Sequence, residues 1–74
     1  MNEDERNKLI ELTSRAVSVN EKLLSNEKEF IAAVSATSDL TSLEAMNDRL
    51  NVLCCEEHLL LAASRSLLQI MNPK

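Results

Sequence analysis

Residues 50–63 read LNVLCCEEHLLLAA and lie at the centre of an apolar stretch that runs from Leu43 to Met71. Within this stretch, four residues at a spacing of seven fall along one line of an α-helix: Met46, Leu53, Leu60 and Leu67. A second line with the same spacing lies elsewhere around the helix: Ala45, Val52 and Leu59. A helix that covers only one neighbour would be polar there. The pattern therefore predicts one long helix that is covered from two directions.

The composition predicts an all-α fold. The chain has 74 residues, with no Gly, Trp or Tyr, one Phe and one Pro. Without Gly there is no residue that adopts positive φ at low cost, which disfavours tight β-hairpin turns and phosphate-binding loops. Good helix formers such as Ala, Leu and Glu are abundant. We expect a single small domain over residues 1–74.

The first half of the chain predicts another long helix, from about residue 3 to about residue 35. Asn2 and Glu5 have the spacing of a helix N-cap and its N3 partner. Apolar residues then follow in parallel rows at a spacing of seven. The rows are Leu9, Ala16, Leu23 and Phe30; Ile10, Val17, Leu24 and Ile31; and Leu12, Val19, Asn26 and Ala33. Asn26 either reaches water at the edge of the apolar surface or is a buried group that sets the register, as in coiled coils.

A polar segment separates the two helical patterns and predicts a turn at about residues 36–41. Thr41 and Glu44 have the spacing of a capping box, which starts the second helix at about residue 42; Asp39 or Ser38 are alternative caps. Asn72 followed by Pro73 predicts the end of this helix at about residue 71. Two long helices with a short connection must lie antiparallel to bury their apolar surfaces, so we expect an α-helical hairpin.

Charge and hydropathy exclude several functional classes. The net charge is −4, and the Lys and Arg residues are scattered with almost no aromatic residues between them, which disfavours nucleic-acid binding. The longest apolar run, residues 59–63, is far shorter than the roughly 20 residues of a membrane span. The acidic residues 2–5 do not look like a signal peptide. We expect a cytoplasmic protein with reduced cysteines and no membrane partner.

Cys54, Cys55 and His58 form the one cluster of reactive side chains in the sequence. Cys54 and His58 are four apart and share a helix face, but a structural zinc site needs four ligands, so only a second subunit could complete one. We expect Cys54 to fill the core as a small apolar residue, His58 to lie at its rim and Cys55 to point away. A helical hairpin offers no concave pocket for a nucleophile. The sequence predicts no enzyme, no cofactor and no metal site.

Apolar residues make up 45% of the chain, more than two helices can bury against each other. The sequence therefore predicts a binding module that contacts another helical protein. The residues predicted to bind a partner are Leu9, Ala16, Leu23, Phe30, Ala45, Val52 and Leu59. Phe30, the only aromatic residue, fits an interface anchor and an internal contact equally well. The alternatives are a homodimeric four-helix bundle with a structural or regulatory role, and a small regulator that contacts DNA-binding proteins or acts as an antitoxin-like inhibitor.

The pattern of the whole hairpin resembles a known family. An acidic, glycine-free chain of this length, with Leu43, Met46 and Leu50 at helical spacing and the segment LLAASRSLL at residues 60–68, is similar to the small co-chaperones of bacterial type III secretion needle subunits (YscE and EscE type). The resemblance implies a cytoplasmic virulence-associated chaperone function. Its implied partners are a tetratricopeptide-like chaperone and the needle subunit, whose amphipathic helix is kept from polymerising. The chain departs from the family in lacking Tyr and Trp between its helices.

Overall fold

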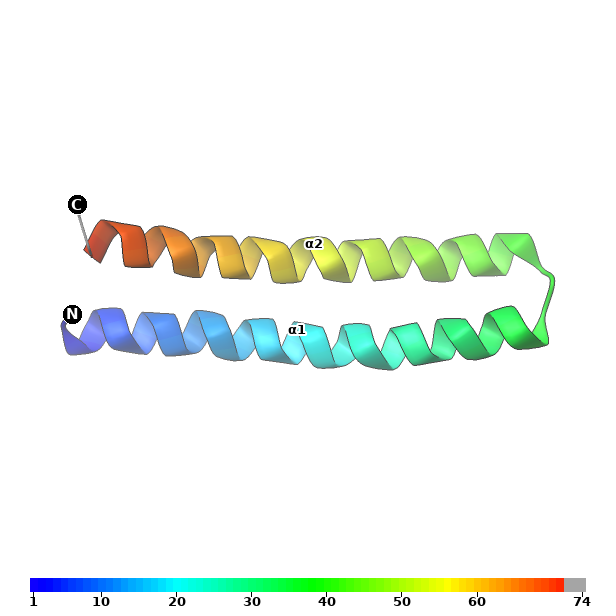
Figure 1. Cartoon of the computed structure of the whole chain (residues 1–74), viewed down its shortest axis with the longest axis horizontal. Coiled ribbons are helices and arrows are strands. Elements are labelled where there is room, and N and C mark those ends of the chain that lie inside the picture. Colours follow the sequence, from blue (N-terminus) through cyan, green and yellow to red (C-terminus); the bar gives the residue numbers. More distant parts are fainter. Residues whose placement is uncertain (72–74) are drawn as a thin grey trace.

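A computed structural model describes residues 1–71 and shows an all-α, antiparallel two-helix hairpin, which confirms the predicted fold class. Helix α1 spans Glu3–Ala36 and helix α2 spans Leu40–Met71. The two helices lie side by side, and the N-terminus and the end of α2 are at the same end of the molecule (Figure 1). The molecule measures 53 × 18 × 14 Å, with a radius of gyration of 16.8 Å. A compact domain of this length would have a radius of gyration of about 11 Å, so the hairpin is strongly elongated.

The start of α1 forms through the predicted capping box. The backbone N–H of Glu5 donates to the Asn2 side-chain oxygen at 2.8 Å, and the backbone N–H of Asn2 donates to the Glu5 carboxylate at 2.9 Å. The first turn also carries Glu3 and Asp4, whose negative charges favour the positive end of the helix dipole. Residues 2–5 therefore fix the beginning of the helix by themselves.

The second helix begins at Leu40, two residues earlier than the Thr41 capping box predicts, because Asp39 is the cap. One Asp39 carboxylate oxygen accepts from the backbone N–H of Thr41 at 3.2 Å, and the other accepts from the Ser42 hydroxyl at 2.8 Å. These hydrogen bonds, the one from the Ser42 hydroxyl first, hold the pKa of the Asp39 carboxyl below its ordinary value. The connection is thus only residues 37–39. The predicted stop signal, Asn72 followed by Pro73, lies outside the described residues.

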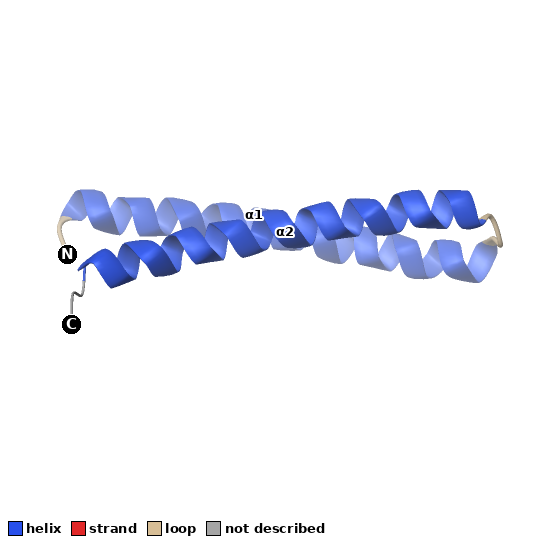
Figure 2. Ribbon diagram, turned by 90° about the horizontal axis from the view of Figure 1, so that it is seen from above, coloured by secondary structure: helices blue, strands red, loops and turns tan. Residues whose placement is uncertain are grey.

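The less exposed side chains of each helix follow a heptad pattern, with alternate spacings of three and four, which we call the core rows. The core row of α1 contains Leu9, Leu12, Ala16, Val19, Leu23, Asn26, Phe30 and Ala33. The core row of α2 contains Leu43, Met46, Leu50, Leu53, Glu57, Leu60, Ser64, Leu67 and Met71. Seen from above, the helices cross at a shallow angle, as expected of coiled-coil packing (Figure 2). The hairpin is therefore a two-stranded antiparallel coiled coil.

The core of this coiled coil is small. Its buried residues are Leu12, Ala16, Val19 and Leu23, all on α1, and no described residue of α2 reaches the same degree of burial. The two core rows meet along a line between the helices, which we call the seam. A helix pair has no third element to cover the two sides of this seam, so the side chains of α2 remain half-exposed. The folded hairpin consequently leaves much of its apolar surface in water.

Polar residues interrupt both core rows. Asn26 is half-buried, and its side-chain amide donates to the backbone carbonyl of Lys22 on its own helix at 2.7 Å. Glu57 and Ser64 are half-buried in the row of α2, and the Ser64 hydroxyl donates to the Leu60 carbonyl at 3.2 Å. Asn26 thus lies in the seam, not at the edge of the apolar surface as the first interpretation predicts. It makes no hydrogen bond to α2, although a residue that sets the register would make one.

Candidate interaction surfaces

An extended set of exposed apolar side chains from both helices lies on one flank of the seam, and we call it the broad face. It contains Ile10, Val17, Leu24 and Ile31 of α1 with Leu61 and Leu68 of α2. The four α1 residues each follow a core residue directly in the sequence, so they lie together on one side of the core row. Val17 and Leu61 line the same hollow between the helices, with Thr13 and Asn20, which shows that residues of both helices share this flank.

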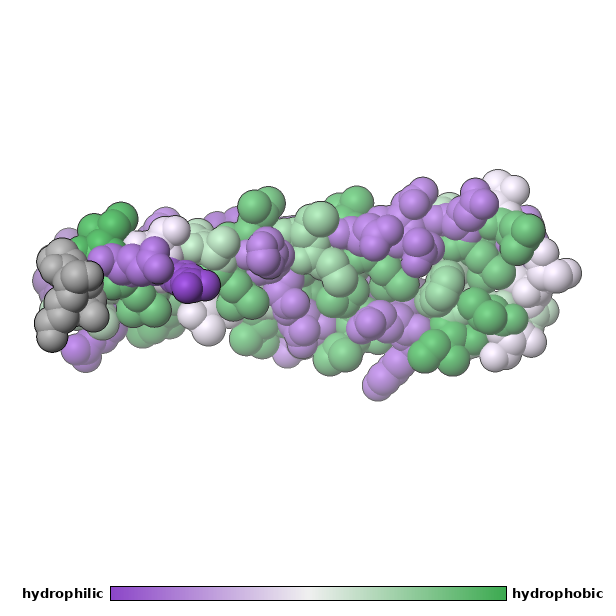
Figure 3. All heavy atoms as spheres, turned by 45° about the horizontal axis from the view of Figure 1, so that its top comes forward, coloured by the Kyte–Doolittle hydropathy of each residue, from purple (hydrophilic) through white to green (hydrophobic). Residues whose placement is uncertain are grey.

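The broad face is exposed along most of the hairpin. Its side chains range from 48% exposed at Leu68 to 67% at Ile31. Green, apolar side chains reach the surface at intervals along the length of the molecule, with polar side chains between them (Figure 3). Single exposed apolar residues are ordinary, but a set of six large apolar side chains that follows one flank of a hairpin is typical of a contact surface.

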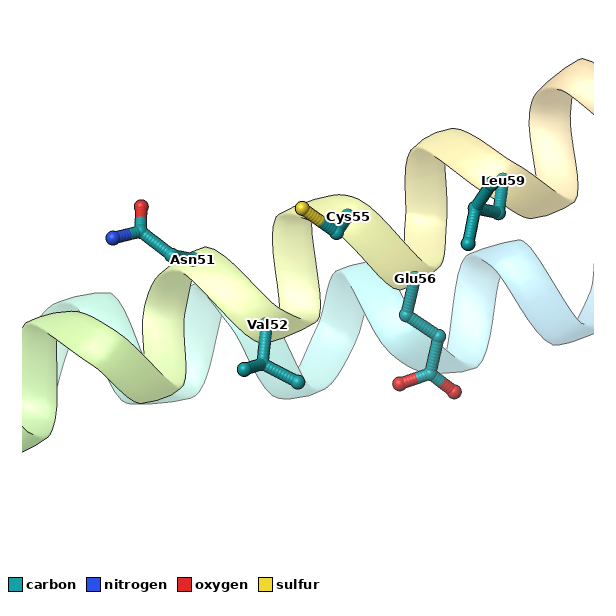
Figure 4. A pocket seen from close by; sticks show the side chains of 5 residues that line it. All are labelled: Asn51, Val52, Cys55, Glu56 and Leu59. Atoms are coloured by element: carbon teal, nitrogen blue, oxygen red, sulfur yellow. The ribbon is translucent and has the colours of Figure 1, made fainter.

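A second, narrower apolar surface lies on the outside of α2, and we call it the outer ridge: Ala45, Val52 and Leu59. Val52 is 65% exposed and Leu59 is 68% exposed. They line an open hollow of about 490 Å³ together with Asn51, Cys55 and Glu56. The close view shows that all five side chains come from successive turns of α2, with Asn51 and Cys55 to one side and Val52 and Glu56 to the other (Figure 4). The hollow is therefore a shallow surface feature of one helix.

The structure divides the residues predicted to bind a partner into two groups. Ala16 and Leu23 are buried in the core of the hairpin, and Leu9 and Phe30 are half-buried in the same row. Ala16 and Leu23 are not available to a partner of the folded hairpin, because α2 already covers them. The outer ridge, in contrast, is exposed as a binding surface requires. Its role in partner binding stays a prediction.

The row that sequence reasoning did not select is Ile10, Val17, Leu24 and Ile31. A signal for its exposure is present in the residues three positions further along. For the row that begins at Leu9, the residues three positions after each member are mostly apolar. Each heptad then has two apolar positions, which is what packing along a seam requires. After Ile10, Val17 and Leu24 the corresponding residues are Thr13, Asn20 and Glu27, which are polar. The row that begins at Ile10 therefore could not form the seam and had to lie beside it.

The cysteine cluster differs from its prediction at Cys54. Cys54 is exposed and not part of the core, whereas Cys55 is exposed, as expected of a side chain that points away from the core. Both line an open hollow with His58 and Leu59 on the outside of α2. Cys54 lies one position beyond the core residue Leu53, which turns its side chain out of the seam. Within residues 1–71, no group of three or more His, Cys, Asp or Glu side chains is placed to hold a metal ion.

Two further observations bear on what the chain is. In the part of the chain that the structure describes, neither helix combines the length and the apolar character needed to cross a membrane. No family model, curated protein or solved structure matches the chain.

Proposed function

We propose that this chain is a non-enzymatic helical-hairpin binding module that covers an apolar helix of another protein. The observation that supports the proposal is the placement of large apolar side chains on the outside of an already folded hairpin, with Val52 and Leu59 more than half exposed. The small core of the hairpin adds to this, because a chain with so little internal burial gains stability from any partner that covers the remaining surface.

The mechanism is burial. A specific interface covers about 800 Å² on each partner. Apolar surface removed from water stabilises a complex by about 25 cal/mol per Å², before the costs of association. The outer ridge offers side chains at a spacing of seven, which is the spacing that a second helix lying along α2 would contact. A bound helix would thereby be kept from aggregating.

The more specific form of the proposal is a co-chaperone in the bacterial cytosol, similar to those of type III secretion needle subunits. Its support is the resemblance in length, acidity and helical pattern, together with the hairpin architecture. In this form, the outer ridge contacts a tetratricopeptide-like chaperone, and the two proteins together hold the apolar helix of the needle subunit.

The test is affinity capture of the tagged protein from its native lysate, with the bound proteins identified by mass spectrometry. The Val52→Glu and Leu59→Glu variants should lose the partner while circular dichroism shows unchanged helix content. Ser18→Glu is a suitable control, because it places the same charge on the exposed polar side of α1. Partner binding that survives both ridge substitutions would refute the assignment of the ridge. Recovery of a tetratricopeptide-like protein with a small needle-like subunit would support the co-chaperone form.

A further inference from the structure

We propose that the broad face binds a second copy of this chain, in an antiparallel twofold arrangement that produces a four-helix bundle. This goes beyond the proposed function, which concerns only the outer ridge. The broad face is a separate surface, and the proposal states what binds to it. Four properties of the broad face point to a second copy: the amount of exposed surface, the spacing of its α1 residues, the position of its α2 residues and the distribution of charge.

The first property is area. The chain exposes 5719 Å², whereas a compact monomer of its mass of 8.3 kDa would expose about 4,600 Å². The excess is about 1,100 Å², which is slightly more than the roughly 800 Å² that each partner contributes to a standard interface. One interface between two copies is therefore enough to bring the exposed surface of each chain into the ordinary range.

The second property is the spacing of the α1 residues. Ile10, Val17, Leu24 and Ile31 are evenly spaced by seven, over about 32 Å of helix at 1.5 Å per residue. A twofold axis between Val17 and Leu24 places Ile10 of one copy opposite Ile31 of the other, and Val17 opposite Leu24. The row of one copy therefore matches the row of a second copy that runs in the opposite direction. A closed twofold interface requires this match of a surface with itself.

The third property is the position of the α2 residues. Leu61 and Leu68 lie in the half of α2 nearer the chain termini, and the hollow shared by Val17 and Leu61 places them beside the first half of the α1 row. Toward the turn, the same row of α2 continues at a spacing of seven through Cys54 and Asn47, which offer less apolar surface than leucine, and ends at Leu40 at the start of the helix. The twofold arrangement brings Leu61 and Leu68 of one copy over the turn-proximal half of the other. Each copy thereby supplies a large apolar side chain, Leu61, over the part of the row where the other copy has Cys54 and Asn47.

The fourth property is charge. The heptad pattern places Arg6 and Arg65 on the broad-face flank near the termini, together with Glu3, and it places Glu27 and Glu44 on the same flank near the turn. All five side chains are exposed, and the flank is net positive near the termini and negative near the turn. An antiparallel pair of copies places the basic end of one against the acidic end of the other, whereas a parallel pair would bring like charges together. Such exposed pairs contribute little energy but select the orientation.

The test is the molar mass in solution, measured by analytical ultracentrifugation in the presence of a reducing agent, so that Cys54 and Cys55 do not form disulfides. The wild-type chain should be a dimer. Val17→Glu should raise the dissociation constant of the dimer by more than about 100-fold, because it buries two carboxylates at the interface. Val52→Glu is the matched control, since it changes another exposed valine (65% exposed, against 53% for Val17) that lies on the outer ridge, and it should leave the dimer intact.

The relative orientation of the two copies is tested by reversing charges. The charged residues are exposed, so these substitutions leave the core of the hairpin unchanged. Arg65→Glu should weaken the dimer by about three- to tenfold, and the double variant Arg65→Glu, Glu44→Arg should restore it. A spin label on Asn7→Cys, in a chain whose own cysteines are replaced by Ser, should give a distance between the two copies of about 40 Å. A monomeric wild-type chain, equal effects of Val17→Glu and Val52→Glu, or a label distance below about 20 Å would overturn the proposal. None of these outcomes affects the test of the outer ridge.

Discussion

Leu23 and Leu24 are adjacent in the sequence but occupy opposite environments, and replacing each by alanine tests the assignment of the core. Leu23 is 7% exposed and Leu24 is 51% exposed. Leu23→Ala removes apolar atoms that are nearly all buried, which costs about 2 to 3 kcal/mol of unfolding free energy from the transfer of the lost groups, plus any cavity that remains. In Leu24→Ala, about half of the lost surface already faces water, so the cost is about 1 kcal/mol.

The assay is thermal unfolding followed by far-ultraviolet circular dichroism, in solutions dilute enough that copies of the chain do not associate. For a domain of this size, the loss in Leu23→Ala corresponds to a decrease in Tm of about 10 to 20 °C, against about 4 to 8 °C for Leu24→Ala. The two variants have the same composition and the same helix propensity, so each is the control for the other. Equal decreases in Tm, or a larger decrease for Leu24→Ala in dilute solution, would refute the core assignment.

Three other substitutions test local features of the hairpin. Asn26→Leu should raise the stability of the hairpin by about 1 kcal/mol, because a seam position then gains an apolar side chain and loses only a hydrogen bond within its own helix. Urea unfolding measures this change. A loss of stability would show that the amide is needed in the seam. Asn2→Ala should cost about 1 kcal/mol and fray the first turn of α1, which amide hydrogen exchange detects. Asp39→Asn should remove a pH-dependent part of the stability. Because hydrogen bonds from Ser42 lower the pKa of Asp39 in the folded state, its ionised form stabilises the hairpin above the unfolded pKa, and this contribution is lost as the pH falls through the folded pKa. Wild type and Asp39→Asn should therefore differ most in Tm near neutral pH and converge in acid, and a difference that grows in acid would contradict this.

The hairpin architecture could be predicted from the sequence because its determinants are local. The capping box of Asn2 and Glu5 joins residues three apart, and it forms as predicted. The start of the second helix was ambiguous, since Ser38, Asp39 and Thr41 all satisfy the rule for a cap. The structure selects Asp39, whose carboxylate accepts hydrogen bonds from both the Thr41 N–H and the Ser42 hydroxyl. Local patterns gave three possible caps, and only the geometry of the connection distinguishes them.

The division between core and surface was harder to predict, because two adjacent rows of α1 are equally apolar. Both Leu23 and Leu24 belong to rows at a spacing of seven, so the spacing of seven alone does not show which one α2 covers. The distinguishing signal is weaker and lies in the residues three positions further along, which are mostly apolar for the row of Leu23 and mostly polar for the row of Leu24. On α2 the difficulty is greater, since the core row includes the polar residues Glu57 and Ser64 and omits Cys54. A prediction based on hydrophobicity therefore leaves Glu57 and Ser64 out of the core and assigns Cys54 to it instead.

The three-residue connection between the helices also determines the order in which the hairpin can fold. Contacts next to residues 37–39 close the shortest loops and cost the least chain entropy, but the buried residues Leu12 to Leu23 lie far from the turn along α1. Closing that cluster onto α2 encloses more than about 30 residues of chain. We therefore expect both helices to extend away from the turn before the best-packed layers form. We expect substitutions near the turn to slow folding, and substitutions near the free ends of the helices to change mainly the rate of unfolding.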